Sequence, residues 1–323
     1  MAIGKCHWFP RSTAAALVER SAIWIVLLCL LIAMALLSDA FHLPAFLGNI
    51  VRQMAPVGMA AIGVTYVMVL GGIDLSVGAV ISLAAVLCAV EMDGKVANIP
   101  WAVLVTLLAG MAIGLVNGAL VAFSRASPFI LTLGSSLAVY GLTQIYSGGT
   151  ARGIVAAEFR DVFNYRVGGV APVLALAFLL AAILAAQVLR RSRYGRILYL
   201  VGSNPRAART IGLPIESLTL GTYALSGAFA AAGGIALLAR SGVSSTFAGR
   251  GLEFDVLAAV VLGGTTFEGG SGGIGGTVAG MLVLFIAFSI VNIAGLNYNA
   301  QLIIKGTIIV AASAAYAFLK RGR

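Results

Sequence analysis

Apolar runs long enough to cross a lipid bilayer follow one another along almost the whole sequence. They constrain the fold more than any other feature, because a helix needs about 20 apolar residues to span a bilayer. Of the 323 residues, 60% are hydrophobic and only 10% are charged, and the mean hydropathy is +1.03. A soluble domain carries about 25% charged residues. The sequence therefore predicts an all-α polytopic membrane protein whose solvent is the lipid bilayer.

About ten apolar segments are expected to form a transmembrane domain at 22–319, between a cytoplasmic leader at 1–21 and a cytoplasmic tail at 320–323. The segments 76–90 and 255–267 are short for a helix that rises 1.5 Å per residue. Either is a candidate for a half-helix that is buried by its neighbours. The predicted segments are 22–38, 46–70, 76–90, 100–123, 128–146, 171–189, 219–239, 255–267, 277–294 and 300–319.

The basic residues are distributed unequally between the loops, and this predicts the orientation. If the N-terminus is cytoplasmic and the segments alternate, 13 Lys and Arg residues lie inside and 6 lie outside, while Arg52 and Lys305 lie at helix ends. Cytoplasmic loops carry the excess of Lys and Arg. Both termini are therefore predicted to be cytoplasmic. The long loop 190–218 is then inside, and the long loop 147–170 is outside.

Several function classes are disfavoured by composition and motifs. The net charge of +10 does not indicate a nucleic-acid partner, since the basic residues flank apolar runs instead of forming a patch. Three scattered cysteines and two histidines are too few for a zinc site, so we expect neither a metal nor a cofactor. The sequence has no G-x-x-x-x-G-K-[ST] phosphate loop. We therefore expect no enzymatic activity of its own, and any ATP hydrolysis must take place in another chain.

Carboxylates stand at the start of two short apolar segments. Asp74 lies in the stretch Gly71–Gly78, which interrupts a long apolar run, and Asp255 opens the segment 255–267. An ionisable residue inside a membrane is costly and indicates function, but Asp or Ser at a helix start can also cap the helix. The predicted orientation places Asp74 near the inner face and Asp255 near the outer face. Inverted repeats with broken helices beside a transport site have this relation.

Glycine and amide residues in the segment 100–123 indicate close contact with another helix. Gly110, Gly114 and Gly118 repeat at four-residue spacing, so one face lets a neighbouring helix approach closely. The adjacent Asn117 either makes an interhelical hydrogen bond or faces a pore. Polar residues of this kind suit the passage of a neutral, hydroxyl-rich solute. The candidate residues of a translocation path are Asp74, Ser76, Asn117, Thr132, Asp255 and Asn292.

The inner loop is predicted to contain a short helix. Asn204 can cap it, Pro205 suits its first turn, and Gly212 is expected to end it in a left-handed conformation. Ala207 and Ala208 are expected to be exposed, where a lone protein would favour charge. Small exposed residues let a partner dock closely, although the segment could be only a connector. The candidate coupling residues are Gly202, Asn204, Arg206, Ala207, Ala208 and Gly212.

The order and spacing of these segments resemble a known transporter family. The Ala-Ala-x-x-x-Gly pattern at 207–212 looks like the coupling loop of bacterial ABC-importer permeases. Together with Gly71–Gly78, Pro128–Gly134 and Val260–Gly276, it resembles the ribose/galactose/xylose-type monosaccharide permeases over residues 50–320. The resemblance implies a multi-pass subunit of the inner membrane that pairs with a second permease copy, identical or different. It also implies a cytosolic ATP-binding subunit and a periplasmic sugar-binding protein.

Two other function classes compete with ATP-driven sugar import. An ion-coupled secondary transporter of a small neutral solute is the main alternative, but it usually places several ionisable groups inside the membrane. In the early segments only Asp74 is a candidate. An intramembrane enzyme is disfavoured because no acid, base or nucleophile is paired. The stretch Gly269–Gly273 fits the G-x-S-x-G serine pattern, but that pattern needs a histidine after the serine, and the last histidine is His42.

Overall fold

The computed structural model describes residues 13–37, 43–124 and 126–293, together with the isolated residues 295, 299, 303, 306 and 307. This part of the chain is helical except for one small antiparallel hairpin, formed by β1 (Arg166–Val167) and β2 (Ala171–Pro172). The helices are α1 (Thr13–Leu37), α2 (Leu43–Leu70), α3 (Val77–Met92), η1 (Val96–Asn98), α4 (Ile99–Phe123), α5 (Pro128–Ser147), α6 (Ala157–Asn164), α7 (Val173–Arg191), α8 (Arg193–Ser203), α9 (Pro205–Thr210), α10 (Ile215–Ser241), α11 (Leu252–Leu262) and α12 (Ile274–Ile293).

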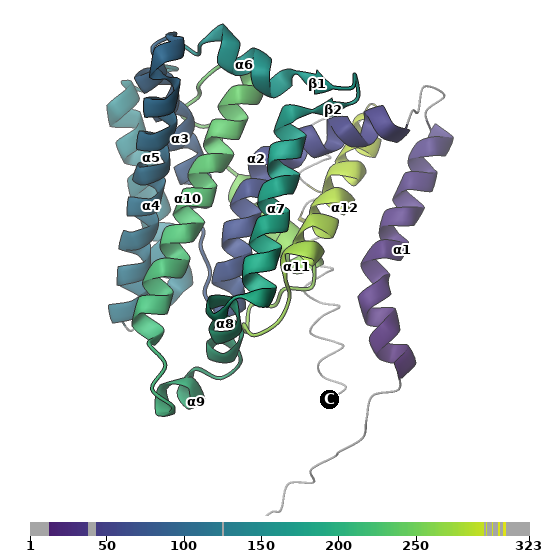
Figure 1. Ribbon diagram of the computed structural model, residues 1–323, viewed down its shortest axis with the longest axis vertical. Coiled ribbons are helices and arrows are strands. Elements are labelled where there is room, and N and C mark those ends of the chain that lie inside the picture. The colour runs from purple at the N-terminus through teal and green to yellow at the C-terminus, as the bar shows by residue number, and fades with distance from the viewer. Residues whose placement is uncertain are drawn as a thin grey trace, which may run out of the picture.

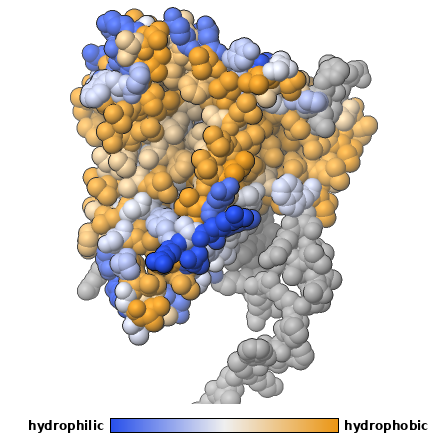
Figure 2. All heavy atoms as spheres, viewed as in Figure 1, coloured by the Kyte–Doolittle hydropathy of each residue, from blue (hydrophilic) through white to orange (hydrophobic). Residues whose placement is uncertain are grey.

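The prediction of an all-α polytopic membrane protein is confirmed. Among the described residues, six helices are long and apolar enough to cross a membrane. Two further apolar helices, at Ile23–Leu36 and Val77–Met92, are shorter. Figure 2 shows, on the face in view, a largely apolar middle between two ends where hydrophilic residues gather. The six long spans are Pro44–Leu70, Val96–Phe123, Pro128–Ser147, Val173–Arg191, Ile215–Ser241 and Ile274–Ile293.

The first nine predicted segments each correspond to a helix. The tenth, 300–319, lies outside the described residues except for isolated positions, as do the tail 320–323 and the first twelve residues of the leader 1–21. α11 is short, as predicted. Its 11 residues extend about 16 Å, which is half of a bilayer core about 30 Å thick.

The two long connections contain the short helix α9, which the sequence predicted, and the elements α6, β1 and α8, which it did not. The connection 147–170 contains α6 and β1 at one end of the bundle, and 190–218 contains α8 and α9 at the opposite end (Figure 1). We refer to these ends as the α6 end and the α9 end. The apolar helices run between them, so each connection caps one end of the membrane-spanning bundle.

α2 lies at the centre of the bundle, and α4 and α5 lie at its edge. In the most apolar part of α2, 89% of the residues are buried, compared with 22% in α4 and in α5. α10 packs between α2, α3 and α4. The glycine face predicted on α4 is the face that contacts α10: a Cβ atom on Gly114 would collide with the backbone carbonyl of Tyr223. Close helix contact through small residues is a usual way to join membrane helices.

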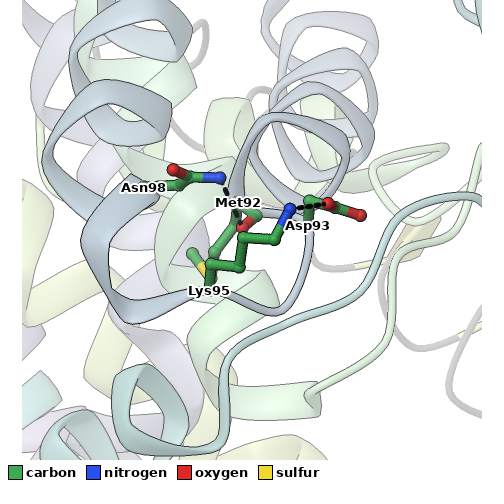
Figure 3. Close-up of polar contacts among 4 residues, drawn as sticks. All are labelled: Met92, Asp93, Lys95 and Asn98. Carbon is green, nitrogen blue, oxygen red and sulfur yellow. Dashed lines mark hydrogen bonds and ion pairs between the residues drawn. The ribbon is translucent and has the colours of Figure 1, made fainter.

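A tight turn at the α6 end reverses the chain between α3 and α4. Asp93 ends α3 with a left-handed φ of 48°, which Asp tolerates better than most residues. Its carboxylate accepts a hydrogen bond from Lys95 Nζ at 2.7 Å, and Asn98 donates to the Met92 carbonyl at 3.3 Å (Figure 3). Gly94 N donates to Ile154 O at 2.8 Å, so the turn is tied to the segment that leads into α6.

Candidate functional site

The predicted interruption after α2 is a break in the helix. Gly71 adopts a left-handed φ of +92°, and its N–H, with that of Gly72, closes the last turn of α2 on Met68 O and Val67 O. Helical backbone then resumes at Val77, the first residue of α3. In a bilayer, backbone groups of such a break need partners from the protein.

A buried carboxylate organises the break. Asp74 is 1% exposed. Its Oδ1 accepts hydrogen bonds from Ser76 N at 3.0 Å and Ser76 Oγ at 2.6 Å, and its Oδ2 accepts one from Ser226 Oγ of α10 at 2.7 Å. The hydroxyl distances are in the range of about 2.5–2.7 Å that is typical of charge-assisted hydrogen bonds. The nearby N-terminus of α3 also favours a negative charge.

Side chains from three other helices complete this network. Asn117 of α4 donates through Nδ2 to Ser76 Oγ at 2.8 Å. Thr132 Oγ1 of α5 accepts from the backbone N of Leu75 at 3.1 Å. Tyr223 of α10 donates through its hydroxyl to the backbone carbonyl of Ile73 at 3.1 Å. The structure thus brings together Asp74 and three other predicted path residues, and it ties α4, α5 and α10 to the break.

The prediction that Asp74 caps the helix that follows it is wrong. The residue that precedes α3 is Ser76, and its side chain makes no capping hydrogen bond. The Ser76 hydroxyl donates to Asp74 instead. Asp74 lies two residues further back, where its carboxylate bonds the Ser76 N–H and not the first turn of the helix. It therefore shapes the break itself and does not cap α3.

The other two predicted path residues lie on different helices. Asp255 is 5% exposed and lies in the first turn of α11, next to Glu253. α11 begins at Leu252, and the residue before it, Gly251, has no side chain that could cap it. Asp255 therefore does not open its segment, as the sequence had suggested, but lies within it. Asn292 is exposed near the end of α12.

The network holds the break against the surrounding helices. It contains one carboxylate, hydroxyls and an amide. No group of three or more His, Cys, Asp and Glu side chains that could hold a metal ion occurs in the part of the chain that the structure describes. Sequence reasoning missed Ser226 and Tyr223. The signal available was their polarity within the apolar helix α10, but their pairing with Asp74 and Ile73 spans 152 and 150 residues.

The second predicted site is the short helix α9, which projects beyond the ends of α8 and α10 (Figure 1). Asn204 caps it by accepting a hydrogen bond from Ala207 N at 3.0 Å, and Pro205 occupies its first turn. Gly212 has a φ of +78°, and Leu213 N donates back to Ala208 O at 3.1 Å. These features are the predicted cap and the predicted left-handed C-terminus.

The prediction that Ala207 and Ala208 are both exposed is half wrong. Ala207 is exposed, but Ala208 is 3% exposed and belongs to the hydrophobic core. Consecutive residues point about 100° apart around a helix, so one face of α9 must lie against the protein. The outer face presents Ala207 and Ile211, which is 70% exposed. Residues at this spacing lie side by side, so Ala207 and Ile211 form a small apolar spot on the free face of α9, among the exposed Arg206, Arg209 and Thr210.

Gly202 supports α9 from inside the protein. It is buried, and a Cβ atom there would collide with the carbonyl oxygen of Val69 at the end of α2. A second tie fixes α8: Tyr199 donates through its hydroxyl to Gly272 O at 2.8 Å. Burial raises the pKa of Tyr199, so the phenol keeps the proton that it donates. Gly202 therefore lets α8 lie close against the end of α2 and is not on the outer surface, while Asn204 and Arg206 are exposed.

Comparison with known proteins finds relatives that match nearly the whole chain. Residues 46–313 match the family described as the permease component of the branched-chain amino acid transport system. The ribose import permease protein RbsC of Escherichia coli (strain K12) is 35% identical over 305 residues, covering 93% of this chain and 94% of the relative. RbsC of Bacillus subtilis (strain 168) is 33% identical over 289 residues, covering 88% and 89%. The galactose/methyl galactoside import permease protein MglC of Salmonella typhimurium (strain LT2) is 31% identical over 313 residues, covering 92% and 93%. No solved structure matches the chain significantly.

Proposed function

Because the chain belongs to this permease family and is a transport subunit of the ABC import type, we propose that it forms the path by which a monosaccharide, ribose or a similar pentose or hexose, crosses the inner membrane. The transported class follows from the relatives, which import ribose and galactose. The polar network around Asp74 supports the proposal, because its hydroxyls and amide suit a neutral, hydroxyl-rich solute. The subunit is not an enzyme.

The free face of α9 is the observation that best supports ATP-driven import. A capped helix that exposes Ala207 and Ile211 beyond the bundle has room for close contact with another protein. The sequence lacks a phosphate loop of its own. We propose that α9 docks into a groove on a cytosolic ATP-binding subunit, with Asn204, Arg206 and Gly212 beside the contact. Gly202 and Ala208 hold the helix in place from within.

Further partners and the finer architecture are part of the same proposal. A periplasmic sugar-binding protein delivers the solute to the α6 end, and a second permease copy, identical or different, completes the pore in the bilayer. Both termini face the cytoplasm, within about ten segments that form the domain 22–319. The broken helices at Asp74 and before Asp255 belong to an inverted repeat. The unequal distribution of Lys and Arg and the short lengths of α3 and α11 support this arrangement.

Uptake into membrane vesicles separates this proposal from an ion-coupled secondary transporter. Vesicles would contain the permease with the ATP-binding subunit and binding protein of the same organism, and radiolabelled ribose and galactose would be the probes. We expect uptake that requires ATP and persists when ionophores collapse the proton and sodium gradients. Uptake that ionophores abolish, or that needs no ATP-binding subunit, would favour the secondary transporter.

A further inference from the structure

The chain between α10 and α11 returns from the α6 end into the middle of the bundle. Ser244 lies at the α6 end, where its hydroxyl donates to Arg152 O at 2.6 Å. Gly249 lies deeper, because its N–H donates to Ser82 Oγ of α3 at 2.8 Å, and a Cβ atom on it would collide with the carbonyl oxygen of Gly78. We call residues 244–251 the re-entrant segment.

The depth of Gly249 follows from the length of α3. Between Ser82 and Met92, the last residue of α3, the helix rises about 15 Å. This end of α3 lies at the membrane surface, because Trp101 at the start of α4 is 59% exposed and donates to Glu91 at 3.1 Å, and exposed tryptophans gather at that level. The hydrocarbon core of a bilayer is about 30 Å thick, so Gly249 lies near its middle.

Two side chains of the re-entrant segment are exposed close to this depth. Phe247 is 52% exposed, and Arg250 is exposed as well. The guanidinium carbon of Arg250 lies 5.8 Å from the centre of the Phe247 ring, which is within the range of a cation–π contact. Ionisable side chains inside a membrane almost always face the protein interior or a water-filled cavity, since lipid does not hydrate a charge. Arg250 therefore does not face lipid.

Water is the covering that suits this surface. A protein packed tightly over Arg250 would bury its charge, and an unpaired buried charge is costly. The break at Asp74 lies nearby, because Gly78, which contacts Gly249, is the second residue of α3. The members of the network around Asp74 are themselves buried, with Asp74 1% exposed. The re-entrant segment thus brings an exposed charge and an exposed ring to the middle of the membrane beside the break.

We propose that Phe247 and Arg250 line the water-filled path of the solute, so that the path passes along the re-entrant segment. This inference rests on the proposed function, because it locates the path of transport within the subunit. A sugar presents hydroxyl oxygens and a C–H face. The Arg250 guanidinium offers N–H donors for the hydroxyl oxygens, and the Phe247 ring offers an apolar surface for the C–H face.

Reaction of single cysteines with a small, charged, water-soluble thiol reagent tests this inference. Phe247→Cys or Arg250→Cys would be added to a permease in which Cys6, Cys29 and Cys88 are replaced, in cells that produce the ATP-binding subunit and the binding protein of the same organism. Ile183→Cys is the matched control: Ile183 is 55% exposed and lies about 15 Å from the start of α7, in a helix long and apolar enough to span the membrane. We expect the thiols at 247 and 250 to react at least about tenfold faster than the thiol at 183, because the reactive thiolate forms in water and not in lipid.

Labelling would be measured at rest and during sugar uptake, so that a path that opens in only one state is still detected. Reaction at both positions that is no faster than at 183 in either state would overturn the inference. We also expect the reagent to abolish most uptake of radiolabelled ribose or galactose by the Phe247→Cys variant, and to leave uptake by the Ile183→Cys variant unchanged. Unchanged uptake after complete labelling at 247 would show that the segment meets water away from the path, which also overturns it.

The same experiment separates this inference from the proposed function. Fast labelling in a chain that imports neither sugar would leave the water-filled path in place and refute the sugar assignment. Import of either sugar without labelling at 247 and 250 would refute the path along the re-entrant segment and leave the proposed function standing.

Discussion

At the residue scale, one acidic side chain replaces the backbone hydrogen bonds that a continuous helix would have made. Asp74 is buried and accepts three hydrogen bonds, for which Ser76 and Ser226 supply the donors. Two more backbone groups of the break are satisfied by Thr132 and Tyr223. The break is thus a rigid part of the structure. The helical hydrogen bonds that are lost there are replaced by hydrogen bonds to side chains of α5 and α10.

Substitution of Asp74 should destabilise the protein in a graded manner. Asp74→Ala leaves the hydroxyls of Ser76 and Ser226 without their acceptor, so we expect about 2–5 kcal/mol less free energy of unfolding. Asp74→Asn should cost less, because its amide can still accept from Ser76 and donate to Ser226. The thermal unfolding midpoint in detergent, together with sugar uptake, would be measured for each variant.

Asp93→Asn is the control for loss of an acidic residue. The Asp93 side chain is 58% exposed and pairs with Lys95, and exposed pairs contribute about 1 kcal/mol or less. An Asp74→Ala variant that unfolds at the wild-type temperature would show that the network does not hold the break. If that variant is stable and also transports normally, Asp74 has no part in the path either.

At the element scale, α9 combines features that a sequence reveals with one that it does not. Its cap at Asn204 and its left-handed end at Gly212 depend on neighbouring residues only, and both were predictable. The burial of Ala208 depends on how α9 lies against the rest of the protein, which spacing alone does not determine. The glycine face of α4 was predictable because it depends on spacing within one segment. Its partner α10 was not, because it depends on how the helices are arranged. The elements α6 and α8 were missed because they are short and not continuously apolar.

Bulky residues on α9 should separate docking from folding. Ala207→Trp adds a large side chain on the exposed face, and overpacking of a close contact typically costs about 1–3 kcal/mol, or roughly tenfold in association for each 1.4 kcal/mol. We expect the ATP-binding subunit to be lost on co-purification while the permease still inserts and remains folded. Ala208→Trp should instead lower the stability of the permease, because this residue is buried.

Two further variants complete the α9 experiment. Arg206→Ala removes an exposed charge and should have a mild effect. Gly212→Trp strains a left-handed position, where a side chain costs about 1–2 kcal/mol, and adds bulk beside the proposed contact. Retention of the ATP-binding subunit and of full uptake by both Ala207→Trp and Gly212→Trp would mean that the segment is only a connector.

At the scale of the whole molecule, the long apolar helices and their approximate bounds could be read from the sequence, since each apolar run is as long as a bilayer is thick. The arrangement could not be read in this way. The central place of α2, and the pairing of Asp74 with Ser226 across 152 residues, arise from contacts that no local pattern encodes. The candidate path was predicted in part: Asp74, Ser76, Asn117 and Thr132 form one network, whereas Asp255 and Asn292 lie on α11 and α12.

Cysteine labelling should place the two ends of the bundle on opposite sides of the membrane. In a variant with Cys6, Cys29 and Cys88 replaced, single cysteines at Glu158 of α6 and Ser203 of α8 occupy exposed positions. We expect an impermeant maleimide applied from the periplasm to label position 158 and to label position 203 only after the inner membrane is opened. Labelling at 203 from the periplasm would reverse the proposed orientation.

The short length of α11 has a consequence for how the protein is made. A segment of 11 residues with Glu253 and Asp255 in its first turn is too short and too acidic to partition into lipid alone as it leaves the ribosome. It therefore depends on other helices for its place: it packs against α2 and α3, which are synthesised before it, and against α12, which is synthesised after it. α11 thus enters the membrane as part of a helix assembly and not as an independent span.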